Sequence, residues 1–239
     1  MDGKEFGIDE AAVGETAPPF HPNCGCSIVG VVEEEARVLI KREDIINFSN
    51  QYARIYEDGM NNGWKNIAQE TVDELNATLT KYDITSQNEI NHFLAQCFIE
   101  SWCGNALTEI NWRDYPDTSK DREYFNAKYG ERYDLGNLGK DTDDGFYFRG
   151  AGYIQLTGRD NYQKFADEMD DPDIMQGAEY VAENYAWEAA GYYWKNRVQY
   201  RFADNGTPTV SQITYDVNGG QYELMARTNA YNLWSEMSQ

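Results

Sequence analysis

The chain has 239 residues, of which 41% are hydrophobic and 14% aromatic, so most of it is expected to fold around a core. Its formal net charge of −21 argues against nucleic acid and against an anionic membrane surface as partners, because both are bound through lysine and arginine. The same charge does not draw the protein toward anionic polymers, which many bacterial walls are.

The first 35 residues differ in composition from the rest. They contain Pro18, Pro19, Pro22 and two of the four cysteines, Cys24 and Cys26. They lack the apolar run of a signal peptide, and no stretch of the chain approaches the ~18 apolar residues of a membrane helix. We therefore predict a short irregular or β tail over residues 1–35 and one larger domain over 36–239, with cysteines that are free thiols or metal ligands.

Helical periodicity dominates after residue 40, and strand patterns are few. A third helix is predicted to begin at Ser86, where Ser86 and Glu89 form a capping-box pattern, and to be stopped by Gly104. Residues 111–152 show little periodicity and predict a long functional loop. The other predicted helices span residues 41–58, 64–79, 162–169, 178–196, 210–217 and 221–234.

Glu100 has an unusual position in the third helix. On a helical wheel, one apolar stripe contains Ile90, Phe93, Leu94, Cys97 and Phe98. Glu100 falls at the border of this stripe. A half-shielded carboxyl loses hydration in its charged form, so its pKa rises toward the range that a general acid needs. The alternative is a solvated glutamate at the end of a helix.

Glu109 is predicted to lie on the loop that follows this helix. Two carboxylates in unlike surroundings suit glycoside cleavage, because one can protonate the leaving oxygen while the other activates water. A separation of ~6.5–9.5 Å between them would give inversion at the anomeric carbon.

Four blocks of the sequence resemble, in order, those of the family-19 glycoside hydrolases, which comprise chitinases and related phage and bacterial endolysins. The resemblance extends over about residues 40–239. The second block is the most specific, since it follows the signature Y-R-G-R-G-Y-I-Q-L-T-G-x-x-N-Y. The blocks are FLAQCFIESW (93–102) with Glu109 after it, DDGFYFRGAGYIQLTGRDNY (143–162), AWEAAGYYW (186–194) and ITYDVNGGQYELMAR (213–227).

The resemblance implies a mainly α, bilobal, lysozyme-like fold with a cleft, and an inverting mechanism without metal or cofactor. By position, Glu100 matches the general acid, Glu109 the general base and Thr157 the residue that holds the attacking water. The resemblance places the substrate-site residues at Tyr147, Gln155, Asn161, Asn218 and Arg227, of which Arg227 supports the acid.

Some of these residues have simpler interpretations. Asn161 is also suited to capping the following helix, and Asn218 to forming a turn with the two glycines after it. One departure from the family pattern is that the second arginine of the signature is Ala151 here, so only Arg149 remains.

The tail segment PPFHPNCGCSIVG (18–30) resembles the end of phage minor head proteins of the Mu F type. This resemblance implies a phage or prophage product that is made in the bacterial cytoplasm and acts on the wall after lysis or delivery, with phage head proteins as potential partners of the tail. His21, Cys24 and Cys26 are weak candidates for zinc ligands, and a structural turn is the alternative.

The leading hypothesis is a hydrolase of β-1,4 linkages in an N-acetylglucosamine-containing polymer, with bacterial peptidoglycan favoured over chitin. A second hypothesis, from a different class, is a virion or sugar-binding protein that kept the fold and lost turnover. A third is an antibacterial effector with the same chemistry and another route of delivery.

Overall fold

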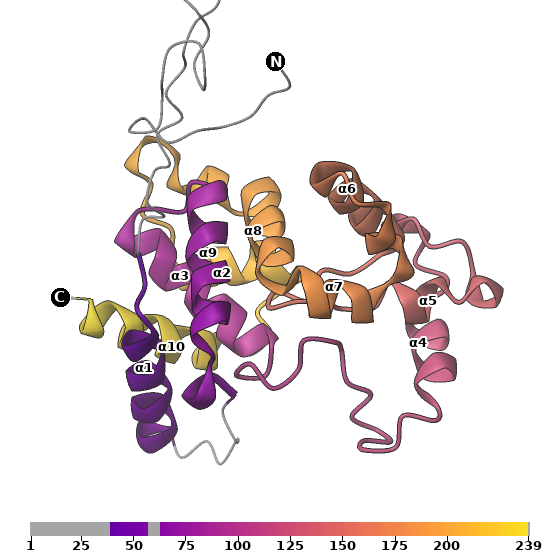
Figure 1. Ribbon diagram of the computed structural model, residues 1–239, viewed down its shortest axis with the longest axis horizontal. Coiled ribbons are helices and arrows are strands. Elements are labelled where there is room, and N and C mark those ends of the chain that lie inside the picture. Colours follow the sequence, from indigo (N-terminus) through magenta and orange to yellow (C-terminus); the bar gives the residue numbers. More distant parts are fainter. Residues whose placement is uncertain (1–38, 57–62, 239) are drawn as a thin grey trace, which may run out of the picture. The chain divides into compact units, whose positions relative to one another are not determined.

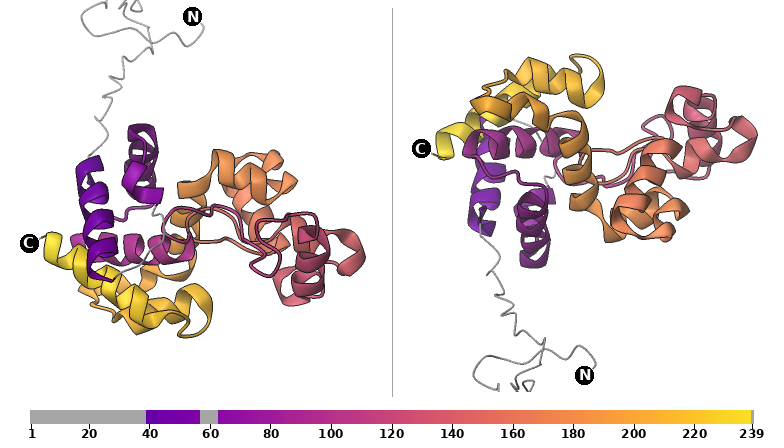
Figure 2. Two further views of the ribbon diagram at one scale, coloured as in Figure 1. Left: turned by 90° about the horizontal axis from the view of Figure 1, so that it is seen from below. Right: turned by 90° about the horizontal axis from the view of Figure 1, so that it is seen from above.

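A computed structural model of the chain describes residues 39–56 and 63–238. Helices dominate these ranges, where the extended pairings are the isolated bridges Thr108–Ala151 and Ala151–Leu156. Figures 1 and 2 show two groups of helices, with α4 to α7 to one side of the others. The predicted mainly α, bilobal fold is confirmed. The tail of residues 1–35, with His21, Cys24 and Cys26, lies outside the described residues, so its predictions remain untested.

The first lobe has an aromatic core. The ring of Phe48 stacks on Trp234 with centroids 4.2 Å apart, and Phe98 meets Phe48 edge-on at 5.0 Å. Burying one such side chain contributes roughly 1.5–3 kcal/mol. The lobe consists of α1 (Arg42–Ile55), η2 (Gly63–Asn66), α2 (Gln69–Lys81), α3 (Gln87–Glu100), α8 (Ala186–Arg197), η6 (Gln199–Asn205), α9 (Val210–Asn218) and α10 (Leu224–Met237).

Helix α3 is the centre of this lobe. All five residues of the predicted stripe are buried, but so are the polar Asn91, His92 and Gln96 on the other side of the helix. The predicted one-sided helix is therefore wrong in this respect. Helices α9 and α10 cover its polar face, and periodicity within α3 does not report that second layer.

The start of α3 is as predicted, but the capping box is incomplete. The Ser86 hydroxyl accepts a hydrogen bond from the backbone N–H of Glu89. The Glu89 carboxylate does not return to Ser86; instead it accepts a hydrogen bond of 3.0 Å from the indole of Trp194 on α8. Burial raises the pKa of Glu89. A residue predicted as a local cap thus connects two helices of the core.

Helix α3 ends at Glu100, four residues before Gly104. The backbone then turns through positive φ at Trp102, Cys103 and Gly104. Glycine is required at position 104 for two reasons. Its φ is +77°, and a Cβ there would lie 2.2 Å from the Trp64 ring. This turn leads the chain directly from the end of α3 into the segment that carries Glu109.

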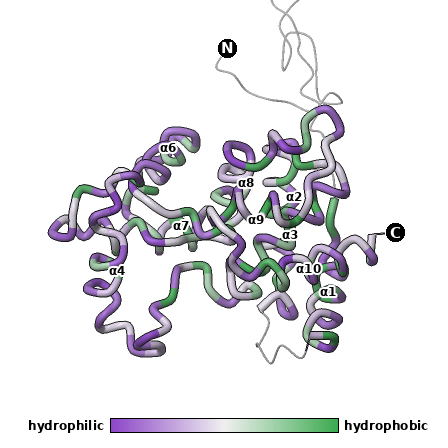
Figure 3. The backbone as a smooth tube through the Cα atoms, turned by 180° about the vertical axis from the view of Figure 1, so that it is seen from behind, coloured by the Kyte–Doolittle hydropathy of each residue, from purple (hydrophilic) through white to green (hydrophobic). Residues whose placement is uncertain are grey.

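The second lobe is smaller and has a separate core that includes Phe148, Leu156, Tyr162 and Phe165. In Figure 3 its helix α4 is coloured mostly hydrophilic, whereas hydrophobic stretches run through α2 and α3. The elements are α4 (Asp121–Tyr129), η3 (Tyr133–Leu135), η4 (Lys140–Thr142), α5 (Asp144–Tyr147), α6 (Arg159–Met169), η5 (Pro172–Gln176) and α7 (Ala178–Asn184). The predicted loop over 111–152 is therefore wrong, because it contains four short helices.

Helix α8 connects the two cores. Ala189 packs in the second core, whereas Trp187 and Trp194 pack in the first. The predicted helix over 178–196 is instead two helices, α7 and α8, which meet at Tyr185 with φ −141° and ψ 28°. The Tyr185 hydroxyl donates to the carboxylate of Asp171, which holds the break in place. Of the helices in the described ranges, none combines the length and apolar character needed to cross a bilayer.

Candidate active site

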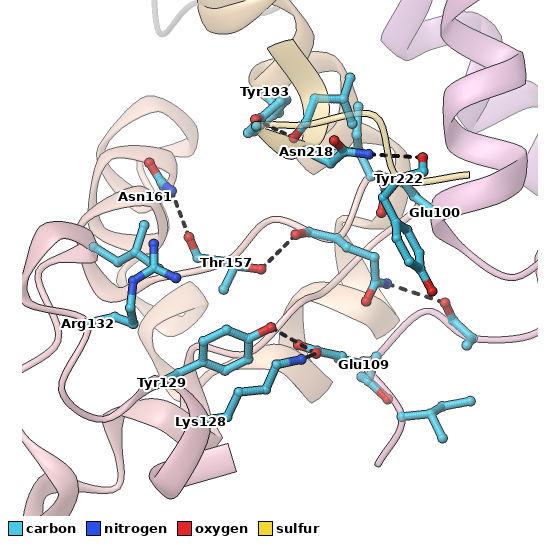
Figure 4. A pocket seen from close by; sticks show the side chains of 18 of the residues that line it. Glu100, Glu109, Lys128, Tyr129, Arg132, Thr157, Asn161, Tyr193, Asn218 and Tyr222 are labelled. Carbon is cyan, nitrogen blue, oxygen red and sulfur yellow. Dashed lines mark hydrogen bonds and ion pairs between the residues drawn. The ribbon is translucent and has the colours of Figure 1, made fainter. Parts of the chain in front are cut away.

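A cleft of about 870 Å³ contains most of the predicted site residues (Figure 4). The first lobe supplies the end of α3, the end of α8 and the turn between α9 and α10. The second lobe supplies α4 and the segment from Gln155 to Asn161. Glu100, Glu109, Gln155, Thr157, Asn161 and Asn218 all line this cleft.

Glu100 lies where α3 leaves the core of the first lobe and meets the cleft. Its side chain is 18% exposed, and Oε1 accepts a hydrogen bond of 2.7 Å from Nη2 of Arg227. Burial raises the pKa of Glu100, while the guanidinium of Arg227 opposes the rise, and the charges of Glu223 and Glu109 add to it. The expected shielding of this carboxyl is thus present, with a cation held beside it.

Arg227 is fixed within the core rather than exposed in the cleft. Its side chain is only 2% exposed. Nη1 donates to the side-chain oxygen of Gln96 on α3, and Nε donates to the carbonyl of Tyr222 at 3.0 Å. Gln96 in turn donates to the hydroxyl of Thr214 on α9. Three helices therefore orient the guanidinium toward Glu100, as expected for a buried charge with its hydrogen bonds satisfied.

Glu109 is positioned by extended pairing with the signature block. Its backbone N–H donates to the Gly150 carbonyl at 2.8 Å, and the Gly150 N–H donates to Oε2 of Glu109 at 3.2 Å. The neighbouring Thr108–Ala151 bridge continues this pairing. Two sequence blocks that lie forty residues apart thus meet at the second carboxylate.

Helix α4 supplies two donors to the other oxygen of Glu109. Lys128 Nζ lies 2.7 Å from Oε1, and the Tyr129 hydroxyl donates to the same atom at 2.9 Å. Burial and the Glu109 charge raise the pKa of Tyr129 to about 12. Burial opposes the charged form of Lys128, but its hydrogen bonds to Glu109 and Tyr129 raise its pKa overall. Both groups therefore remain protonated donors at neutral pH.

Thr157 follows a tight turn that also carries Gln155. The Thr157 hydroxyl donates to the Gln155 carbonyl at 2.8 Å, so toward the cleft it offers an acceptor. Gln155 has a positive φ of 58°, a conformation that non-glycine residues adopt rarely and often at functional sites. Its amide donates to the Gly152 carbonyl at 3.0 Å.

The simpler interpretation holds for Asn218 but is wrong for Asn161. Asn161 does not cap α6, because it lies within the first turn of that helix, after the N-cap residue Gly158, and its amide donates to the Thr157 carbonyl at 2.7 Å. The side-chain oxygen of Asn218 accepts from the Gly220 N–H at 2.9 Å, as in an Asx turn. Because both residues also line the cleft, each has a local structural bond and a position open to substrate.

Tyr147 and the two signature positions lie elsewhere. Tyr147 is not among the residues that line the cleft, and its ring lies 5.3 Å from the Arg122 guanidinium. Arg149 is buried in the second lobe, where it pairs with Glu179. Ala151 is fully buried in the second core. The departure from the family pattern at Ala151 therefore affects the packing of the second core and not the charge beside Glu100, where the cation is Arg227.

Several cleft residues were not singled out by the sequence. Lys128 and Tyr129 fell in the stretch that was predicted as a loop, so nothing showed that they follow each other on a helix facing Glu109. Gln96 looked like an ordinary polar position of α3. The aromatic residues that line the cleft are Trp102, Trp112, Tyr124, Tyr129, Tyr193, Tyr215 and Tyr222.

The two cysteines in the described ranges, Cys97 and Cys103, are buried. Burial raises the pKa of Cys97 well above its ordinary value, which disfavours the thiolate that metals bind. Over residues 39–56 and 63–238 there is no cluster of three or more His, Cys, Asp or Glu side chains that could hold a metal ion.

Comparison with known proteins agrees with this architecture. A Haemophilus influenzae protein described as glycosyl hydrolase family 19 domain-containing is 27% identical over 179 residues, which cover 66% of this chain and 84% of that protein. Chitinase C from Streptomyces griseus HUT6037 has a similar crystal structure, with a TM-score of 0.51 and 16% identity over 81% of this chain and 92% of that one. A chitinase C mutant has a TM-score of 0.48 and 15% identity over 79% and 90%.

No protein-family model matches the chain. The likeness to chitinase C nevertheless establishes a chitinase-like helical fold, as the sequence blocks predicted. The similarity to a phage head protein receives no support from these relatives, and the segment that carries it lies outside the described residues.

Proposed function

We propose that the protein is an inverting glycoside hydrolase of β-1,4 linkages in an N-acetylglucosamine-containing polymer, with Glu100 as general acid and Glu109 as general base. The observation that carries this proposal is the pair of carboxylates in unlike surroundings on one cleft. The relative described as a family-19 glycosyl hydrolase and the chitinase-like fold support the same reaction class.

Glu100 has the surroundings that the acid needs. Its raised pKa favours the protonated carboxyl, which can donate to the leaving glycosidic oxygen. After donation, the carboxylate is paired with Arg227, whose guanidinium already lies 2.7 Å away. Arg227 therefore stabilises the ionised carboxylate that is left after the proton transfer, while burial favours the protonated carboxyl that exists before it.

Glu109 has the surroundings that the base needs. Its Oε1 accepts from both Lys128 and Tyr129, and these two donors hold the carboxyl group in place. Its Oε2 accepts only the longer bond from the Gly150 N–H and is the oxygen best placed to take a proton. The attacking water would donate one hydrogen to Oε2 and the other to the hydroxyl oxygen of Thr157, whose own hydrogen is used on Gln155.

The lining of the cleft suits a sugar chain. Amide side chains of Gln155, Asn161 and Asn218 can pair with hydroxyl and N-acetyl groups, and the aromatic rings offer flat apolar faces to sugar rings. The exposed Arg197 also lines the cleft of this otherwise acidic protein, whereas Arg132, which lines it too, is paired with Asp134. An exposed arginine at this position favours a polymer that carries carboxylates, so we propose peptidoglycan as the natural substrate and keep chitin as the alternative.

The test is product release from purified peptidoglycan and from colloidal chitin, with the anomer of the first product followed by NMR. The proposal expects reducing ends from peptidoglycan and initial formation of the α-anomer, the inverted product of a β-linkage. Initial β-anomer would exclude inversion. Release of product from chitin but not from peptidoglycan would favour the chitinase alternative.

The hypothesis of a sugar-binding protein without turnover predicts oligosaccharide binding and no product from either polymer. Two sequence features favour this hypothesis, Ala151 and the tail that resembles a head protein. Ala151 is buried in the second core rather than exposed in the cleft, and the tail lies outside the described residues. The same assay separates the two functions, because product release that depends on Glu100 is incompatible with binding alone.

A further inference from the structure

A second cavity of about 590 Å³ opens beside the candidate active site and shares Trp102 and Trp112 with it. The two indoles meet edge-on, with ring centroids 4.6 Å apart. The seven residues that line the second cavity are Ile99, Trp102, Cys103, Trp112, Glu223, Met225 and Ala226. The two cavities therefore adjoin at this pair of indoles, and we call the cavity of these seven residues the side pocket.

The chemistry of the side pocket differs from that of the cleft. The cleft offers Gln155, Thr157, Asn161 and Asn218 to the hydroxyl groups of sugars. The side pocket has no side-chain amide or hydroxyl among its seven residues. A sugar ring would leave most of its hydroxyl groups unpaired there, which is unfavourable, whereas small apolar side chains would be well accommodated.

Two walls of the side pocket are strongly exposed apolar side chains. Trp112 is 55% exposed and Met225 is 77% exposed. Glu223, the one charged residue of the lining, is exposed and forms no ion pair with any residue of the described ranges. An apolar wall with a free carboxylate is complementary to a ligand that has methyl groups and an ammonium group.

We propose that the side pocket binds the peptide branch of peptidoglycan, a short alanine-containing peptide that carries a free side-chain amine. The apolar wall would contact the alanine methyl groups, and Glu223 would pair with the ammonium. This inference rests on the proposed function, since it requires the glycan to lie in the adjoining cleft. It distinguishes peptidoglycan from chitin, because chitin has no peptide branch.

The experiment compares two substrates, glycan strands that carry their peptides and the same strands after an amidase has removed them. Met225→Lys places a cation where the ammonium-bearing branch would lie, and Glu223→Gln removes the carboxylate. Leu138→Lys is the matched control, because Leu138 is also exposed, at 63%, and lines neither cavity.

For Met225→Lys, we expect the ratio of kcat/KM on peptide-bearing strands to that on bare strands to fall about tenfold, and for Glu223→Gln a few-fold. The ratio cancels any effect of Glu223 on the acid itself. Leu138→Lys should leave the ratio unchanged. An unchanged ratio in Met225→Lys would overturn the inference. If the ratio stayed the same because kcat/KM fell equally on both substrates, the pocket would be assigned to the glycan.

A binding measurement keeps this test independent of turnover. The Glu100→Gln protein is titrated calorimetrically with an alanine-containing tetrapeptide that has a free side-chain amine, and with its amine-acetylated form. The inference expects binding that weakens about tenfold on acetylation and that Met225→Lys abolishes. If the wild type cleaves neither strand, the proposed function fails, and absence of peptide binding would separately overturn the side-pocket assignment.

Discussion

The surroundings of Glu100 and Glu109 differ in almost every respect. Glu100 ends a helix that is buried on all sides, and its one ionic partner is itself buried. Glu109 lies in an extended segment and is held by Lys128, whose side chain is 42% exposed. The comparison teaches that one type of side chain can be supported in two ways on the same cleft: loss of water raises the pKa of Glu100, whereas donors on a neighbouring helix hold Glu109 in place.

The largest expected effect is on turnover itself. Glu100→Gln and Glu109→Gln should each lower kcat on the responsive polymer by on the order of 10²–10⁴, since each removes one proton-transfer group. The exposed Glu183 on α7 provides the matched control, Glu183→Gln, which should retain full activity. If either cleft variant kept wild-type rates in the reducing-end assay, that carboxylate would lose its assigned role.

The next effect concerns the buried side of the comparison. Arg227→Met leaves the Glu100 charge without its partner, so the free energy of unfolding should fall by about 3 kcal/mol at pH 8. The loss should be smaller at pH 5 than at pH 8, because burial raises the pKa of Glu100 and protonation of its carboxyl removes the unpaired charge. Urea unfolding at both pH values measures this difference. In the Glu100→Gln background the two losses should not add, and simple additivity would show that the pair is not coupled.

Helix α3 also carries a buried histidine, His92, whose pKa depends on the burial of the helix. His92 is 1% exposed and stacks on Tyr231 at 4.0 Å, and neither ring nitrogen makes a well-formed hydrogen bond to a described residue. Burial lowers its pKa to about 4 from 6.5. As the pH falls, the unfolded chain protonates this histidine at a higher pH than the folded protein does. The contribution of neutral His92 to the free energy of unfolding is therefore fully present above about pH 6.5, and roughly 3 kcal/mol of it is lost as the pH falls toward 4.

His92→Phe keeps a ring against Tyr231 and removes the titration. The midpoint of urea unfolding should then change much less between pH 7 and pH 4.5 than it does in the wild type. An equally large acid loss in the variant would place the pH dependence in other groups, such as the carboxylates.

The smallest expected effect concerns the exposed side of the comparison. Lys128→Met removes the ammonium that holds Oε1 of Glu109 and leaves the Tyr129 hydroxyl as the other donor to that atom. The carboxylate should then be less firmly oriented, so kcat in the reducing-end assay should fall several-fold, up to about tenfold.

Lys128→Arg should restore much of the rate, because it keeps a charged donor beside Glu109. Lys140→Met is the control, since Lys140 is similarly exposed and pairs with Glu131 outside the cleft. Wild-type rates in Lys128→Met would show that this ion pair has no part in orienting Glu109.

Much of the site followed from the sequence because its chemistry is local. The border position of Glu100 followed from the periodicity of α3, and the order of the sequence blocks anticipated a helical, two-lobed fold. Glu109, Gln155, Thr157, Asn161 and Asn218 do line one cleft. Tyr147 does not, because it lies at the end of α5, beside Arg122.

What the sequence by itself determined is therefore the set of candidate side chains and the helical class, since both depend on residue type and short-range spacing. Only the tertiary structure decided their partners. Three features depend on segments that are far apart in the chain. Helices α3, α9 and α10 together bury Arg227, and α4 brings Lys128 and Tyr129 to Glu109. The side pocket forms between Trp112 and Met225. Such contacts depend on how helices pack against one another, and periodicity within a single helix carries no information about its neighbours.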